Sequence, residues 1–499
     1  MNRVVLCLVV GMLATFFASP AWAQFDTTPE KIAKGRDLFV HQWQPNDKLS
    51  PNGDGLGPLY NAKSCAECHS QGGVGGSGTN EHNAQMLAFL PEPGKFTQRN
   101  ADAIRNRLKL MHPLFVDDQG RISTGVLLHR YSTNQDYDEV HQRITTPLED
   151  SFESRGRLRR MLRERNLAAA SSMPLQLVAY MREIQFATAD RNPPQLFGAN
   201  LIADGINESD IVAIADTQNK SSYQTGISGR KSGRFGWRGQ LDDLDLFVKG
   251  ACAAEVGLQV QEMLQAEDPT QPDYRLTGVD LEPSQTDELV AFVRSLPRPQ
   301  QVLPEDPNMR SHVSQGQMLF NSIGCAQCHV EDVGAVSGVY SDFLLHNMGA
   351  EFEDPVPAAR IPVTVVTARK LISMPMYYGG EYHRVETFTT IERRDEYQEY
   401  RTPPLWGVAD SAPYLHDGRA ETLREAIEWH GGEATISAAR FMQLDEEQQF
   451  SVLQFLKSLK APEIPKEEAR QFTGNEEHLN DNRISSLVPG TMNSVASRE

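Results

Sequence analysis

Two short stretches, Cys65-Ala66-Glu67-Cys68-His69 and Cys325-Ala326-Gln327-Cys328-His329, decide how this sequence is interpreted. This spacing is typical of c-type haem attachment, in which the two thiols form thioethers and the histidine becomes the proximal iron ligand. A zinc site would need both cysteine pairs to converge into one four-thiolate centre, and a thioredoxin-like motif needs no adjacent histidine. The sequence therefore predicts two covalently bound c-type haems, attached through Cys65, Cys68, Cys325 and Cys328 and ligated by His69 and His329.

Four features occur twice in the same order, which indicates an internal duplication. Each copy has a short amphipathic helix, a haem motif, a pair of prolines and a helix with apolar residues at i, i+3, i+4 and i+7. Besides the haem motifs, the pairs are Gly35–Phe39 with Gly316–Phe320, Arg191–Gly198 with Arg401–Gly407, and Leu289–Leu296 with Val452–Leu459. This is the outline of a cytochrome c domain. We expect a mainly α fold of two tandem cytochrome c-like helical domains, the first with large loop-rich insertions.

The boundary between the two domains is expected near residue 300, where several prolines interrupt the chain. A third segment, Leu177–Ile184, resembles the closing helices but has no haem motif, so it is interpreted as part of the insertion in the first domain. The predicted organisation is a signal peptide at 1–23, a first domain at 24–300, a second at 301–465 and a polar tail at 466–499.

The first residues have the three parts of a secretory signal. A start charged by Arg3 precedes an apolar run, and Ala21-Trp22-Ala23 forms a small-x-small end. The run is short for a membrane anchor, the alternative interpretation. We expect export to the periplasm with cleavage after Ala23, and no membrane anchor.

The composition narrows the range of partners. The chain has 499 residues, 39% of them hydrophobic, and a formal net charge of −18. An acidic chain without a basic block is a poor nucleic-acid binder, whereas a small basic redox protein could be attracted to it. Such a charge also serves solubility alone.

The lone Cys252 lies in an Ala-rich helical stretch, where a thiol is usually a small buried hydrophobic group rather than a reactive one.

The stretch Glu425–Ala434 predicts a helix that ends in a histidine. Thr422 and Glu425 have the spacing of a capping box, so the helix should begin near Leu423. It should end at His430, with Gly431 as a left-handed cap. Leu423, Ala426, Ile427 and His430 form one buried stripe, which places the histidine as a core residue or as the sixth ligand of the second haem iron.

The first copy differs at the corresponding position. Aligning Asp204-Gly205 with Asp417-Gly418 sets Thr217 against His430 and Ala203 against His416. A haem with two histidine ligands transfers electrons, whereas an iron with an open or labile sixth position can bind peroxide or dioxygen. The sequence thus predicts a reactive first haem and an electron-transferring second haem. The alternative is an electron carrier whose first haem takes a ligand from the insertion, where His82, His112 and His129 are available.

These residues resemble a known family, the exported bacterial di-haem oxidoreductases of the peroxidase and thiol oxidoreductase type, relatives of the bacterial di-haem cytochrome c peroxidases. The matching stretches span most of the chain after the signal: Gly55–His69, Gly226–Gly239, Tyr340–Gly349, Arg401–Gly407 and Pro413–Ala434. In the peroxidase relatives a methionine binds the C-terminal haem at the position that His430 occupies here. The resemblance implies His329/His430 coordination and a lower potential than that of a His/Met haem.

The resemblance implies a peroxidase-type oxidoreductase that uses a small redox protein as electron donor and a small oxidant such as peroxide. It assigns no catalytic acid–base residue, because residues 71–190 match the family poorly. His82, Glu81, His112 and His129 are candidates for a distal ligand or proton donor, or ordinary packing residues. The remaining candidates are His346 and His416 near haem propionates or as competing ligands, and Trp237 and Trp406 as relays or packing residues.

Two further functions stay open at this point. One is a purely electron-transferring di-haem protein, and the other is a haem dioxygenase of a bulky apolar substrate. A protein-modifying oxidase that works through the haems over a distance is a variant of the enzyme hypothesis.

Overall fold

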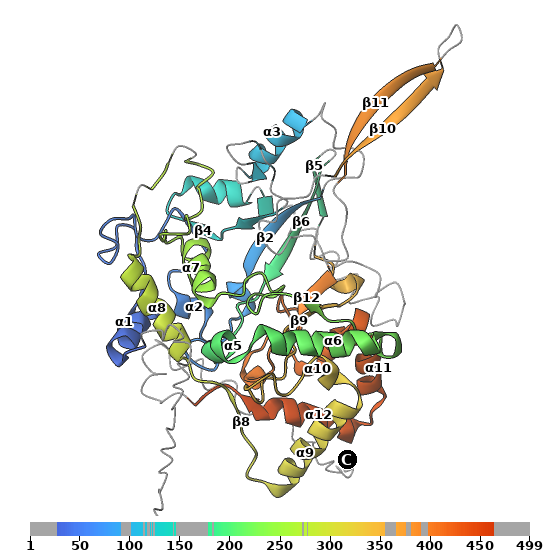
Figure 1. Cartoon of the computed structure of the whole chain (residues 1–499). Helices are drawn as coiled ribbons and strands as arrows, with labels where there is room; N and C mark the ends of the chain where they lie inside the picture. Colours follow the sequence, from blue (N-terminus) through green and yellow to red (C-terminus); the bar gives the residue numbers. More distant parts are fainter. Residues whose placement is uncertain are drawn as a thin grey trace, which may run out of the picture.

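The computed structural model describes most of the chain between residues 27 and 463 (Figure 1). The residues within this range that it leaves out are 91–100, 113–114, 117–119, 121, 123–124, 143, 146–177, 182–183, 272–273, 277, 355–365, 376–380 and 391–397. The predicted signal peptide and the whole predicted polar tail lie outside the described residues.

Helical residues outnumber strand residues in the described part, which confirms the mainly α prediction there. The helices are α1 Pro29–Val40, α2 Cys65–Cys68, α3 Ala101–Met111, α5 Ala199–Gly205, α6 Glu208–Thr225, α7 Leu244–Glu255, α8 Pro283–Ser295, α9 Pro307–Ser322, α10 Leu423–Trp429, α11 Thr435–Gln443 and α12 Glu446–Ser458. The strands are β1 Leu59–Tyr60, β2 Ala84–Leu90, β3 Gly125–Leu128, β4 Tyr131–Ser132, β5 Val178–Met181, β6 Ile184–Arg191, β7 Arg230–Lys231, β8 Gln300–Gln301, β9 Leu344–Asn347, β10 Val366–Pro375, β11 Glu381–Thr390, β12 Glu399–Arg401 and β13 Leu459–Lys460.

Two helix pairs repeat the same close crossing. α1 packs on α8, and α9 packs on α12. A Cβ on Gly35 would lie 1.8 Å from the carbonyl oxygen of Glu288, and one on Gly316 would lie 1.9 Å from that of Ser451. In each pair, therefore, only a glycine lets the first helix touch the backbone of the closing helix.

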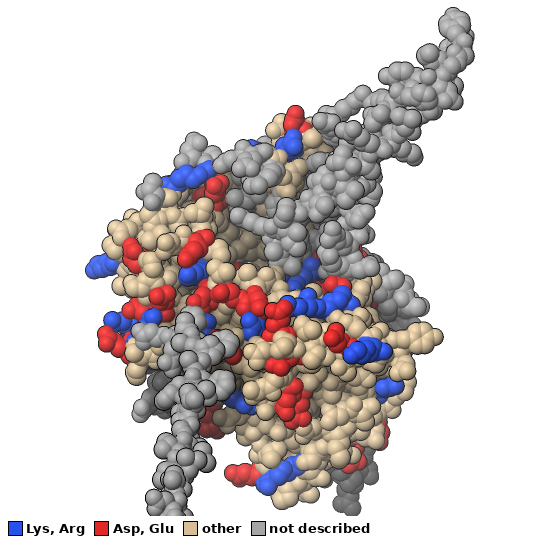
Figure 2. Space-filling view, viewed as in Figure 1, with Lys and Arg blue, Asp and Glu red and all other residues tan. Residues whose placement is uncertain are grey.

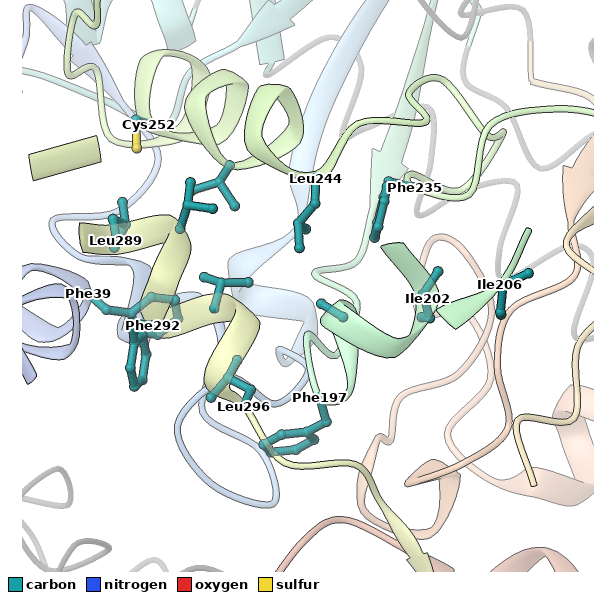
Figure 3. Packing of buried hydrophobic residues seen from close by; sticks show 14 of the residues in the cluster. Phe39, Phe197, Ile202, Ile206, Phe235, Leu244, Cys252, Leu289, Phe292 and Leu296 are labelled. Carbon is teal, nitrogen blue, oxygen red and sulfur yellow. The ribbon is translucent and has the colours of Figure 1, made fainter. Parts of the chain in front are cut away.

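Each crossing also brings two phenylalanines together. The ring centroids of Phe39 and Phe292 are 5.1 Å apart at 58°, and those of Phe320 and Phe455 are 5.3 Å apart at 59°. Figure 3 shows Phe39 and Phe292 side by side at the left end of the cluster, which continues through Leu244 and Phe235. The two copies thus share their packing geometry as well as their sequence order.

The insertion of the first copy departs from the prediction. Its described part contains α3 and a four-stranded antiparallel sheet in the order β3-β2-β6-β5, with Leu87 and Phe186 fully buried, so it is not merely loop-rich. Leu177–Ile184, interpreted as part of the insertion, resembles the closing helices in sequence only, because residues 178–181 and 184 onward form β5 and β6. A short apolar segment has no fixed period of its own, and here antiparallel pairing of β5 with β6 decides its conformation.

The two copies meet along their proline pairs. A Cβ on Gly198 would lie 2.9 Å from the ring of Trp406, and one on Gly407 would lie 2.3 Å from Gln195 Oε1. The side-chain amide of Gln195 donates to the carbonyl oxygen of Trp406. A second junction is the sheet β12-β9-β7, which joins a strand of the first copy to two strands of the second.

The surface carries charges of both signs. On the face drawn in Figure 2, acidic and basic side chains are intermingled. Among the described residues, no helix is long and apolar enough to cross a membrane.

Replacing Gly316 by Ala is expected to lower the free energy of unfolding by about 1–3 kcal/mol, because the added methyl group overpacks the α9–α12 crossing. Gly250→Ala is the matched control. Gly250 lies within α7 and has no atom within 4 Å of the position of an added Cβ, so alanine there should stabilise the protein by roughly 0.5–1 kcal/mol. Chemical unfolding of the haem-loaded protein measures both values, and equal effects would contradict the close crossing.

Candidate haem-binding sites

Both haem motifs fold into a single helical turn. The amide N–H of His69 donates to the carbonyl oxygen of Cys65 at 3.0 Å, and that of His329 donates to Cys325 at 3.0 Å. The Ser64 hydroxyl caps the first turn by accepting from the Glu67 N–H at 3.2 Å. Residues at i, i+3 and i+4 of a helical turn lie on one face, so each motif presents two thiols and one imidazole together.

The two proximal histidines are oriented in the same way. His69 Nδ1 lies 3.0 Å from the carbonyl oxygen of Gly76, and His329 Nδ1 lies 3.1 Å from that of Tyr340. A carbonyl oxygen only accepts, so Nδ1 carries the proton and the Nε2 lone pair is available for iron. Burial lowers the pKa of both imidazoles to about 4, which keeps them neutral and able to bind a metal.

Each proximal ring also packs on the phenylalanine of its first helix. The ring centroids of Phe39 and His69 are 6.5 Å apart, and those of Phe320 and His329 are 6.3 Å apart. The glycine-mediated crossing therefore helps to place the histidine that would hold each haem.

His430 faces His329 across the second site. The two ring centroids are 6.4 Å apart at 54°. Two metal–imidazole bonds of about 2.0–2.1 Å would occupy about two thirds of this separation, and the two ring radii would occupy the rest. His430 Nδ1 lies 2.7 Å from the carbonyl oxygen of Ala426, which leaves its Nε2 free to bind. The pair of histidines fits a six-coordinate haem iron.

The helix that carries His430 begins and ends close to the predicted residues. α10 begins at Leu423, its cap Thr422 accepts from the Glu425 N–H at 3.2 Å, and His430 is the residue after its last turn. The prediction for Gly431 is wrong: its φ of −114° is extended, and it is Gly432 that has a positive φ of 53°. The left-handed residue is therefore one position later than predicted. Gly432 lies against β9, because a Cβ added to it would be 2.1 Å from the carbonyl oxygen of Asn347.

A cavity of about 280 Å³ surrounds the second site and extends toward the first copy. His329, His430, Cys325 and Cys328 line one part of it. The other part is apolar, with Ile202, Phe235, Leu244 and Phe247 from the first copy. A largely apolar lining with a few convergent polar groups suits a haem.

The first copy has no matching histidine on α6. Thr217 is exposed, and its hydroxyl donates to the carbonyl oxygen of Ala213 on the same helix at 2.8 Å. The next residue, Gln218, is buried and donates to Asp342 Oδ2 at 2.7 Å and to the carbonyl oxygen of Gln327. This helix therefore supports the second site instead of delivering a ligand to the first.

The four distal candidates of the insertion lie in different surroundings. Glu81 is exposed and accepts from the Thr79 hydroxyl, which also contacts His82 Nδ1 at 3.0 Å. His112 is fully buried against Phe115, and His129 Nε2 donates to the carbonyl oxygen of Ala254 at 2.8 Å. Burial lowers the pKa of His112 to about 3 and that of His129 to about 4. Their roles stay predictions.

His346 lies in a buried charge cluster beside the second site. Its Nε2 is 2.9 Å from Asp342 Oδ2 and its Nδ1 is 2.8 Å from Glu433 Oε2. Burial alone would lower the pKa of His346, but hydrogen bonds, led by the one with Asp342, raise it to about 12. Although Cys328, Asp342 and His346 offer ligand atoms within 4.8 Å of one another, both nitrogens of His346 are occupied by carboxylates.

Glu433 and Asp342 are the residues that the sequence interpretation missed. The Glu433 carboxylate is 12% exposed and accepts from His346, Arg230 and two backbone N–H groups. Burial favours its neutral form, but these bonds, led by the one from His346, lower its pKa to about 2. In the sequence, the only sign of a role for Glu433 was its position directly after Gly431 and Gly432.

The remaining candidates lie around the junction of the two copies. His416 stacks on Tyr400 with ring centroids 4.1 Å apart, and burial lowers its pKa to about 3. Trp406 is 2% exposed, and Trp237 donates through Nε1 to the carbonyl oxygen of Asn192 at 2.8 Å.

Cys252 is 2% exposed within α7, which confirms that it is buried, and burial raises the pKa of its thiol to about 12.

Replacing His346 by Gln is expected to destabilise the haem-loaded protein by about 3–5 kcal/mol, because it removes the cation between two buried carboxylates. Since the folded-state pKa of about 12 exceeds the unfolded value of about 6.5, the stabilisation by His346 is complete below about pH 6.5 and falls as the pH rises toward 12. The stability difference between wild type and variant should thus be smaller at pH 9 than at pH 6. Urea unfolding tests this, with the half-buried His312→Gln as control; an equal difference at both pH values would contradict it.

The match of this chain to a known family lies at its C-terminal end. Residues 391–459 match the family model described as "Di-haem oxidoreductase, putative peroxidase". The curated relative "Hydrazine synthase subunit gamma" of Kuenenia stuttgartiensis is 26% identical over 162 residues, which are 31% of this chain and 44% of the relative. This chain therefore spans less than half the length of that relative.

Two solved structures are also similar to this chain. One is hydrazine synthase of Kuenenia stuttgartiensis, with 15% identity and a TM-score of 0.26 over 54% of this chain and 73% of that chain. The other is a MauG-like protein associated with microbial copper homeostasis, with 18% identity and a TM-score of 0.25 over 46% of this chain and 72% of that chain.

The family match supports haem binding by this chain, and it covers α10, which carries His430. The resemblance of this chain to the di-haem oxidoreductases is therefore confirmed, with the family signature in residues 391–459.

Proposed function

We propose that this protein is a periplasmic di-haem c-type cytochrome that acts as a peroxidase-type oxidoreductase. It consists of two tandem cytochrome c-like domains, residues 24–300 and 301–465, that follow a cleaved signal peptide. The repeated Gly35 and Gly316 crossings support this organisation, as do the matched surroundings of His69 and His329.

Cys65, Cys68 and His69 would hold one haem. Cys325, Cys328, His329 and His430 would hold the other, with the two histidines as its iron ligands. When bound, each haem supplies an iron that changes oxidation state, and an iron with a labile sixth position can also bind a small oxidant.

The observation that carries the proposal is the difference between α10 and α6. His430 faces His329 at the distance that an iron between two imidazoles requires, whereas Thr217 bonds to its own helix and is exposed. The second site is therefore suited to electron transfer alone. The first site is suited to the reaction, because α6 offers it no corresponding histidine.

The proposed reaction is the reduction of peroxide. One H₂O₂ takes up two electrons and two protons, its O–O bond breaks, and two waters form. The electrons come from a small redox protein, and the net charge of −18 would attract a basic one. Two haems in one chain would allow both electrons to be held ready for a single turnover.

The purified protein is expected to contain one low-spin and one partly high-spin haem, and to oxidise a reduced small cytochrome when peroxide is added. Electron paramagnetic resonance measures the spin states, and stopped-flow absorbance measures the reaction. Two six-coordinate low-spin haems in every redox state, with no response to peroxide, would leave only the electron-transfer function.

Replacing His430 by Ala should turn the second haem high-spin and raise its potential, because the iron loses a strong nitrogen ligand. The first haem should keep its spectrum. His312→Ala on α9 is the control and should change neither haem, since its ring contacts Ser451 and Phe450. An unchanged spectrum in His430→Ala would make His430 a packing residue.

A further inference from the structure

Glu433 binds four donors with its two carboxylate oxygens. Oε2 accepts from the Ser228 N–H at 2.8 Å and from His346 Nδ1 at 2.8 Å. Oε1 accepts from the Asn347 N–H at 3.1 Å and from Arg230 Nη2 at 2.9 Å. A carboxylate offers about four lone-pair sites, so the bonding capacity of this group is fully used. Bonds of this kind, in which one or both partners are charged, are stronger than neutral ones.

The donors come from parts of the chain that are distant in sequence. His346 and Asn347 belong to β9, whereas Arg230 begins β7 of the first copy and Ser228 precedes it. Arg230 also pairs with Glu399 of β12 at 2.6 Å. Through these contacts Glu433 is anchored to all three strands of the sheet β12-β9-β7.

The chain between this anchor and His430 is short and tightly packed. Only Gly431 and Gly432 separate the two residues. A Cβ on Gly431 would lie 2.7 Å from the carbonyl oxygen of Met348, and one on Gly432 would lie 2.1 Å from that of Asn347. The end of α10 therefore cannot shift relative to β9 while Glu433 keeps its bonds.

We propose that Glu433 is a positioning residue that holds His430 at the second haem. Through Ser228 and Arg230, the first copy contributes to the position of this ligand. The inference rests on the proposed ligation by His430 and adds the residues that keep it in place. A purely structural Glu433 would contribute to stability without changing the coordination of the iron.

The test uses the full-length, haem-loaded protein and the variants Glu433→Gln and Glu433→Ala. Both lose the anionic acceptor, so the high-spin fraction of the second haem should rise at least tenfold above wild type. Added imidazole should restore the low-spin spectrum by occupying the vacated position.

Arg230→Gln removes one donor from the first copy and should act in the same direction but less strongly. Glu428→Gln is the matched control, because Glu428 lies on α10 and pairs with the exposed Arg424.

The outcomes separate this inference from the proposed function. If His430→Ala leaves the second haem unchanged, the ligation and this inference both fail. If His430→Ala produces a high-spin haem but folded Glu433→Gln and Arg230→Gln keep the wild-type spectrum, His430 is the ligand and the positioning role of Glu433 is overturned. Should Glu433→Ala fail to fold, Arg230→Gln decides by the same spectrum.

Discussion

The contact of a glycine with the backbone of a facing helix is the constraint on which both halves of this molecule depend. At Gly35 and at Gly316 the first helix touches a carbonyl oxygen of the closing helix, and a side chain of any size would separate them. This crossing brings a phenylalanine of each helix together, and one of the two phenylalanines packs on the proximal histidine. The histidine then donates Nδ1–H to a backbone carbonyl, which leaves the Nε2 lone pair available for an iron. A steric constraint far from the cofactor thus helps to determine the orientation of its ligand.

Beyond this shared frame the two copies differ in the helix that corresponds to α10. In the second copy α10 is short and ends at a histidine, whereas in the first copy α6 continues to Thr225 and directs Gln218 to the second site. The first copy therefore helps to build the second site. The first copy also contributes to the second site through Arg230 of β7 and through Ser228 just before it, because both donate to Glu433. The two candidate haem sites are therefore linked through the packing of the first copy on the second.

Much of this could be predicted from the sequence because the relevant signals are local. The haem motifs, the helices flanking them and the cap at Thr422 each depend on residues within a few positions of one another. The errors occur where tertiary contacts decide. Leu177–Ile184 has the apolar pattern of a short helix, but residues 178–181 pair with β6, and β6 in turn pairs with β2, so this part of the chain forms strands. Gly431 has the position of a helix cap, but contact with β9 moves the positive φ to Gly432.

The sequence by itself determined the chemistry: two thiol pairs, two proximal histidines and a third histidine at the end of a helix. It could not determine which groups lie opposite each iron, because that depends on residues distant along the chain that only the folded backbone brings together. His430 was predicted because the cap at Thr422 and the buried stripe of its helix are local patterns. Glu433 was not, since its four partners are drawn from β9 and from the first copy, and no local pattern records them.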